Sequence, residues 1–81
     1  MGDFVVRIPR VSIGITEATL IEYLVPDGGR VEDGQALFLV ETEKVETEIP
    51  SGATGTVRWT GEVGTLYPVG TEIGVITTDG T

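Results

Sequence analysis

Short runs of alternating apolar and polar residues, separated by turn residues, extend along the whole chain. Glycine or proline recurs every few positions, which leaves no stretch with room for a convincing helix. The alternation instead predicts strands, because a period of two places one face of each strand in a core. The predicted strands are residues 4–8, 19–24, 30–31, 36–42, 45–49, 55–60, 65–67 and 72–77. Many short strands at this spacing predict an all-β sandwich or flattened barrel.

The second half of the chain repeats the pattern of the first half. An offset of 36 residues aligns hydrophobic, aromatic and turn positions without a gap. The aligned pairs are Ile21 with Val57, Tyr23 with Trp59, Gly28 with Gly64, Gly34 with Gly70, Leu37 with Ile73, Leu39 with Val75 and Val40 with Ile76. The repeat predicts two four-stranded antiparallel sheets related by a pseudo-two-fold axis. Tyr23 and Trp59 are then packing residues, and Gly34 and Gly70 serve turns that need a positive φ.

The first half contains an insertion. Ile8-Pro9 matches Ile49-Pro50 at an offset of 41, which predicts about five additional residues within Val11, Ser12, Ile13, Gly14 and Ile15. This apolar loop lies between the first two strands. It either closes one end of the sandwich or faces a partner.

Composition restricts the chemistry that the chain can perform. A length of 81 residues predicts a single domain. Because these residues include no His and no Cys, we also predict no metal site, no disulfide and no catalytic residues in this domain. The strand pattern places its core at about residues 4–77, and residues 78–81 resemble the start of a linker. A net charge of −8 disfavours nucleic acid and anionic membranes as partners.

Lys44 is the only lysine, and the strand pattern places it at the tip of a hairpin between residues 36–42 and 45–49. Glu41, Glu43, Glu46 and Glu48 flank it. The repeat places both chain ends at the opposite pole. For most small β domains, such a hairpin is a solvated edge that resists association. A unique lysine at a tip, far from both termini, instead favours an attachment point whose amine is acylated by a cofactor.

At these residues the chain resembles the lipoyl domain of the acyltransferase component of 2-oxo acid dehydrogenase complexes. The resemblance extends from about Val5 to Ile76 and includes the stretch from Val40 to Val45, which contains Lys44. Further matching segments are Ile8-Pro9, residues 15–20, residues 26–31, residues 33–38 and Ile49-Pro50-Ser51. The family fold is a flattened barrel-sandwich hybrid. The Thr16-Glu17 segment is typical of lipoyl domains rather than biotin carriers.

The resemblance implies a lipoyl carrier with lipoate amide-linked to Lys44. Glu41, Glu43 and Val45 would flank the lysine for the lipoate-attachment enzyme, and the loop from Val11 to Thr16 and Glu17 would contact partners. The lipoyl arm would be acylated by a thiamin-dependent 2-oxo acid decarboxylase. It would then transfer the acyl group to coenzyme A on the acyltransferase core and be reoxidised by dihydrolipoyl dehydrogenase. The resemblance also implies a monomeric domain in the cytoplasm, or in the mitochondrial matrix of a eukaryote.

Two alternatives remain. A biotin carrier would share the fold, but biotin acceptor lysines typically lie between methionines, whereas Glu43 and Val45 flank Lys44. An unmodified interaction module would leave Lys44 as a free amine. The family usually has Asp before the lysine and Ala after it, so both flanking residues depart from the family pattern.

Overall fold

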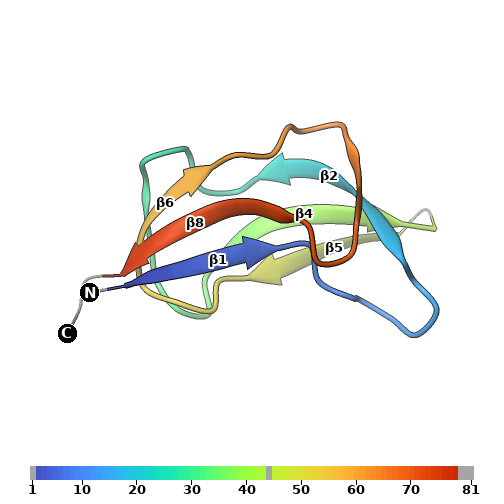
Figure 1. Cartoon of the computed structure of the whole chain (residues 1–81), viewed down its shortest axis with the longest axis horizontal. Helices are drawn as coiled ribbons and strands as arrows, with labels where there is room; N and C mark the ends of the chain where they lie inside the picture. The colour runs from blue at the N-terminus through green and yellow to red at the C-terminus, as the bar shows by residue number, and fades with distance from the viewer. Residues whose placement is uncertain (1, 44, 79–81) are drawn as a thin grey trace.

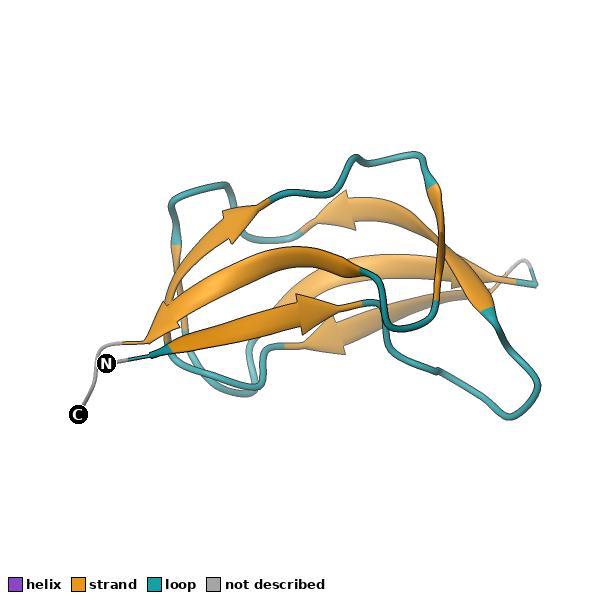
Figure 2. Cartoon of the chain, in the orientation of Figure 1, coloured by secondary structure: helices purple, strands orange, loops and turns teal. Residues whose placement is uncertain are grey.

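A computed structural model of the chain describes residues 2–43 and 45–78 (Figure 1). These residues form eight strands and their connections, coloured by type in Figure 2. The strands are β1 (Asp3–Arg7), β2 (Glu17–Tyr23), β3 (Arg30–Val31), β4 (Ala36–Thr42), β5 (Val45–Pro50), β6 (Gly55–Trp59), β7 (Leu66–Pro68) and β8 (Glu72–Thr78). They pair into two antiparallel four-stranded sheets, β1-β8-β6-β3 and β5-β4-β2-β7. The structure confirms the predicted all-β fold.

The predicted strand boundaries differ from the observed ones by two residues at most. The largest difference is at the start of β2, where Glu17 and Ala18 pair with Pro68 and Tyr67 of β7. That pairing joins segments far apart in the sequence, so the local pattern could not predict it. β8 includes Thr78, one residue beyond the predicted core, and residues 79–81 lie outside the described residues. Within the described ranges, no helix is long and apolar enough to cross a membrane.

The two sheets have equivalent strand orders, which supports the predicted pseudo-two-fold axis. With β1 equivalent to β5, β2 to β6, β3 to β7 and β4 to β8, one sheet order becomes the other. Each sheet nevertheless takes two strands from each half of the chain. The halves therefore interlock, and neither half forms a sheet by itself.

Strand register corrects the predicted offset for the first strand. Phe4 pairs with Ile76, and Thr47 pairs with Val40, so β1 and β5 are related by 43 residues rather than 41. Hydrogen bonds just beyond these strands agree. The Ile8 N–H donates to the Thr71 carbonyl, as the Ser51 N–H donates to the Gln35 carbonyl. Ile8 is thus equivalent to Ser51, and its match with Ile49 was wrong. A two-residue similarity does not determine strand pairing.

A β-bulge at Ile21 accounts for one extra residue of the first half. Leu20 pairs with Val40 and Glu22 pairs with Leu39, so Ile21 has no partner in β4. Leu20, not Ile21, is therefore equivalent to Val57, and both of these side chains are fully buried. The offset falls from 43 to 37 between β1 and β2, which corresponds to six extra residues in their loop instead of the predicted five.

The core lies between the sheets, and a half-buried aromatic pair related by the pseudo-two-fold axis packs against it. The equivalent residues Tyr23 and Trp59 stack with ring centroids 4.0 Å apart. The Tyr23 hydroxyl donates to the Gly61 carbonyl, and the Trp59 indole Nε1–H donates to the Val25 carbonyl. Val25 and Gly61 are themselves 36 residues apart, so the two hydrogen bonds are equivalent as well. Both aromatic residues are packing residues, as predicted.

The fully buried aliphatic and aromatic side chains form the core against which this pair packs. They come from both sheets and from both halves of the chain. They are Ile8, Leu20, Val31, Leu37, Phe38, Val40, Val57, Ile73 and Ile76. Because each sheet contributes one apolar face, burying these side chains requires both sheets together.

Candidate functional site

Strands β4 and β5 are joined by a two-residue hairpin. Thr42 pairs with Val45, which leaves positions 43 and 44 as the connection. Glu43 has a φ of 49°, a left-handed conformation that is uncommon for a residue other than glycine. Two-residue hairpins favour such turns because their twist matches that of the strands. Lys44, the predicted attachment residue, lies outside the described residues, so the structure defines its flanking residues only.

The hairpin carries an acidic surface. Glu41 of β4 lies directly opposite Glu46 of β5 in the ladder. Glu43 lies in the turn between the two strands, and Glu48 lies in β5, two residues after Glu46. Like charges directly opposite each other on paired strands lower stability. The acidic pair therefore weakens the β4–β5 pairing next to the turn.

The loop between β1 and β2 contains a tight turn. The Ile15 N–H donates to the Ser12 carbonyl at 3.3 Å, and Gly14 has a φ of 88°. A positive φ at the third residue is typical of a type II turn. Ile15 is buried and Val11 packs against the core, whereas Ile13 between them is 99% exposed. Two side chains of the insertion therefore close the barrel end, which was one of its two predicted roles, and Ile13 is exposed; that the loop faces a partner stays a prediction.

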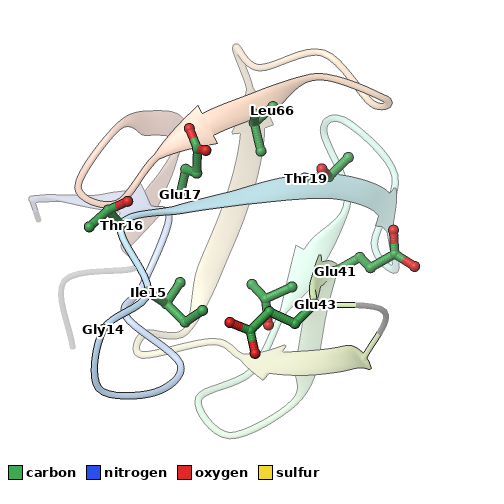
Figure 3. Close-up of a pocket in the computed structure, with 9 residues that line it drawn as sticks. Gly14, Ile15, Thr16, Glu17, Thr19, Glu41, Glu43 and Leu66 are labelled. Atoms are coloured by element: carbon green, nitrogen blue, oxygen red, sulfur yellow. The ribbon is translucent and has the colours of Figure 1, made fainter.

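The loop and the hairpin lie at the same end of the molecule (Figure 1). Residues of both segments line two open hollows. The larger hollow, of about 360 Å³, is lined by Gly14, Ile15, Thr16, Glu17, Thr19, Glu41, Thr42, Glu43 and Leu66. In Figure 3, the side chains of Ile15 and Glu43 approach each other across this hollow. The smaller hollow, of about 250 Å³, is lined by Val11, Ser12, Thr42, Glu43, Val45 and Thr47. Thr42 and Glu43 line both hollows, so both hollows lie between the loop and the hairpin.

The structure thus brings together most of the residues that the sequence singled out. The predicted flanking residues and the predicted loop share the two hollows, and Ile13 is the one predicted loop residue that lines neither. Sequence reasoning missed Thr19, Thr42, Thr47 and Leu66. Leu66 reaches this end because β7 pairs with β2. The repeat could have indicated this pairing, because it relates β7–β2 to β3–β6.

The described chain ends lie at the opposite end of the barrel from the hairpin (Figure 1). Gly2 and Thr78 hydrogen bond to each other, because the Thr78 N–H and hydroxyl both donate to the Gly2 carbonyl. The longest axis of the molecule measures 38 Å. For the described residues, the predicted separation between the ends and the hairpin is confirmed.

Comparison with known proteins agrees with this geometry. A family model named Biotin_lipoyl, described as "Biotin-requiring enzyme", matches residues 5–76. The chain belongs to this biotin/lipoyl family. Membership implies a covalently attached lipoate or, in the wider family, biotin. Neither lipoate nor biotin would need a metal ion or a thiol from the chain, because each cofactor brings its own reactive group.

Curated relatives of this biotin/lipoyl domain are acyltransferase components. The domain is 43% identical over 54 residues to the dihydrolipoyllysine-residue acetyltransferase component of a pyruvate dehydrogenase complex from Mycoplasma capricolum, covering 67% of the chain and 12% of the relative. It is 36% identical over 74 residues to a lipoamide acyltransferase component of a branched-chain alpha-keto acid dehydrogenase complex from Pseudomonas aeruginosa, covering 90% of the chain and 17% of the relative. The corresponding component from Bacillus subtilis is 37% identical over 73 residues, covering 89% of the chain and 17% of the relative.

These relatives confirm the resemblance to lipoyl domains of acyltransferase components. The domain spans 12% to 17% of the length of these three proteins. The aligned part supports a carrier role, and the biotin alternative has no better support among these proteins.

Proposed function

We propose that this chain is a lipoyl carrier domain in which lipoate is amide-linked to Lys44. The observation that carries the proposal is the two-residue connection at positions 43 and 44, closed by the pair of Thr42 and Val45. A rigid turn at the end of a barrel presents its side chains to another enzyme's active site. Lys44 supplies the only lysine amine of the chain.

Attachment forms an amide bond between the lipoate carboxyl carbon and the Lys44 Nζ, with overall loss of one water. When bound, lipoate would supply a dithiolane that can accept an acyl group together with two electrons, both of which would come from the 2-oxo acid through the decarboxylase. The domain's own contribution is position. The hairpin holds the tether at one end of a 38 Å barrel, so the arm is delivered to successive active sites at high effective concentration.

The expected partners are a lipoate-attachment enzyme, a thiamin-dependent 2-oxo acid decarboxylase, an acyltransferase core and dihydrolipoyl dehydrogenase. The names of the relatives support membership of a 2-oxo acid dehydrogenase complex. On this proposal the domain is a non-catalytic carrier within such an assembly, in the cytoplasm or the mitochondrial matrix.

Intact-mass measurement after co-expression with a lipoate-attachment enzyme tests the proposal. We expect one lipoyl adduct on the 81-residue chain and none on Lys44→Arg, because a guanidinium stays protonated and is a poor acyl acceptor. An adduct with a biotin ligase in place of the lipoate enzyme would favour the biotin carrier. Absence of any adduct would favour the unmodified interaction module.

A matched control separates position from mere presence of a lysine. The double variant Lys44→Val with Val45→Lys exchanges the two side chains and keeps composition and charge. Val45 is 60% exposed, so a lysine there is compatible with the fold. We expect the control to remain unmodified. Modification at the wild-type rate would show that the attachment enzyme does not recognise the turn position.

A further inference from the structure

The smaller hollow beside the hairpin is lined by residues on both sides of the acceptor position. Its volume is about 250 Å³, and its lining residues are Val11, Ser12, Thr42, Glu43, Val45 and Thr47. The two valines and the two threonines supply methyl groups, and Glu43 is the only charged residue of the lining. Because Glu43 precedes position 44 and Val45 follows it, the hollow adjoins the acceptor directly.

The pseudo-two-fold axis relates Thr47 in this hollow to Phe4 at the opposite end of the barrel. Thr47 pairs with Val40 of β4, and Phe4 pairs with Ile76 of β8. Val40 and Ile76 are 36 residues apart and are both fully buried. Since paired residues point to the same face of a sheet, Thr47 and Phe4 both point toward the interior, each from an edge strand.

At the end of the barrel near the chain termini, the ring of Phe4 fills the space next to this edge strand. A Cβ on Gly52 would lie 2.7 Å from the Phe4 Cζ, so the ring packs directly against the β5–β6 connection. The equivalent connection at the other end is the β1–β2 loop, which contributes Val11 and Ser12 to the hollow. Thr47 carries no ring there, and the corresponding space is the hollow. The two ends therefore differ by one ring.

We infer that the smaller hollow is a resting site for the dithiolane ring of the chain's own lipoyl arm, which lies against Thr47 as the Phe4 ring lies against Gly52. The inference rests on the proposed function. The arm is the occupant because its acceptor lies between two residues of the lining, Glu43 and Val45. A tethered group meets an adjacent site at high effective concentration, so weak contacts are enough to hold it between visits to active sites.

The lining suits a neutral and mainly apolar ring. Val11 packs against the core, and Val45 is 60% exposed, so a ring between them removes methyl groups from water. Amide formation abolishes the charge of the lysine amine, so the arm can lie against these methyl groups without the cost of dehydrating a cation. Reduction opens the ring into two thiols. The site therefore favours the oxidised arm over the reduced one.

The larger hollow suits the ring less well. Glu17, Glu41 and Glu43 all line it, so three carboxylates would have to lose part of their hydration next to an apolar group. Of the two hollows, only the smaller one contains Thr47, the position equivalent to Phe4.

Methyl NMR spectra of lipoylated and octanoylated chains test the inference. An octanoyl arm on the same lysine is also neutral but carries no dithiolane ring. We expect the Val11 methyl signals to differ between the two chains, because Val11 lines the hollow and is distant from position 44 in the sequence. The difference should disappear when the lipoyl arm is reduced, since reduction opens the ring.

Thr47→Phe introduces the side chain that the equivalent position already carries, and should fill the hollow. The Val11 difference between lipoylated and octanoylated chains should then vanish. A water-soluble phosphine should reduce the dithiolane about threefold faster than in wild type, as expected for a ring that is docked about two thirds of the time. Thr19→Phe is the matched control. Thr19 lines the larger hollow but not the smaller one, so both measurements should match wild type.

Val45→Ser provides a second variant in case Thr47→Phe does not fold. Its side chain is 60% exposed, so the change affects stability little while it removes one apolar wall of the hollow, and the Val11 difference should shrink.

Three results would overturn the inference and leave the attachment at Lys44 intact. They are equal Val11 signals in lipoylated and octanoylated wild type, a Val11 difference that persists in the folded variants of the smaller hollow, and a difference that Thr19→Phe abolishes. A chain that accepts no lipoate would instead reject the proposed function.

Discussion

The two halves of this domain are alike where they build the barrel and differ most in the loop between β1 and β2. Equivalent strands occupy equivalent places in the two sheets, and Tyr23 and Trp59 stack across the axis with equivalent hydrogen bonds. Their ladder partners differ between the halves. Trp59 pairs with Gly74, whereas the smaller Tyr23 pairs with Phe38 at the equivalent position.

The differences between the halves concentrate at one end. The first half has six extra residues between its first two strands and a bulge at Ile21. The extra loop and the β4–β5 hairpin, which contains the proposed acceptor position, together line two hollows. Symmetry therefore serves stability, and the departure from symmetry creates the surface on which we expect recognition.

The largest expected effect concerns a position where the halves differ by one methyl group. Ala18 is buried in β2, and its equivalent is Gly55 in β6. A Cβ on Gly55 would lie 2.1 Å from the Thr77 carbonyl oxygen. Because that oxygen belongs to the backbone of the paired strand β8, we expect Gly55→Ala to lower the free energy of unfolding by about 3 kcal/mol. Urea unfolding followed by Trp59 fluorescence measures this.

The reverse substitution is the control for that comparison. Ala18→Gly removes a buried methyl and adds backbone freedom, so a loss of about 1 kcal/mol is expected. If both variants lost the same stability, the halves would tolerate a methyl equally and the steric argument would fail.

An intermediate effect tests the reciprocal aromatic pair. Tyr23→Phe keeps the stack on Trp59 but removes the hydrogen bond to the Gly61 carbonyl. At neutral pH this should lower the free energy of unfolding by about 1 kcal/mol. Thermal unfolding of both proteins provides the measurement. Unchanged stability would mean that the hydrogen bond from Tyr23 to the Gly61 carbonyl makes no net contribution to the free energy of unfolding.

The same variant changes the response to alkali. Desolvation by burial raises the pKa of Tyr23 above its ordinary value of 10.0, and the charges of Tyr67, Asp27 and Glu62 raise it further. Above pH 10.0 the unfolded chain therefore releases the Tyr23 proton before the folded chain does, so stability falls as pH rises. Tyr23→Phe lacks this contribution. The stability difference between the two proteins should narrow above that pH, and a constant difference would contradict the burial of the hydroxyl.

The smallest effect concerns the acceptor hairpin. Glu43 has a φ of 49°, and asparagine tolerates this conformation better than glutamate. We expect Glu43→Asn to raise the free energy of unfolding by about 0.5 kcal/mol, measured as a higher Tm. Glu48→Gln is the charge control, because it also removes one acidic side chain of the hairpin but lies within β5. Equal gains in both variants would assign the effect to charge rather than to backbone strain.

The fold was largely predictable because its determinants are local and repeated. Alternating residues located all eight strands, and turn residues separated them. Gly34 and Gly70, expected to need a positive φ, have values of 91° and 94°. The errors arose where pairing distant in sequence decides the outcome. The Ile8–Ile49 match suggested a wrong register, and β2 began earlier than expected because β7 extends it.

The candidate site was predicted in part for the same reason. The hairpin and the loop are each continuous segments, so the sequence could single them out. Thr19 and Leu66 were missed because they reach this end through strand pairing, of β2 with β4 and of β7 with β2. The sequence around such a residue shows only the alternation of an ordinary strand. It therefore gives no sign that the side chain contributes to a site formed by other strands.

By itself, the sequence determined the class of fold, the repeat, and the position of a unique lysine between two strands. It could do so because alternation, turn chemistry and composition act over a few residues. Only the tertiary structure decided that the halves interlock, that six residues rather than five extend the first loop, and that Ile13 is exposed while Ile15 is buried. These outcomes depend on which strands pair and on what covers each side chain, and both are fixed only when the two sheets close on one core.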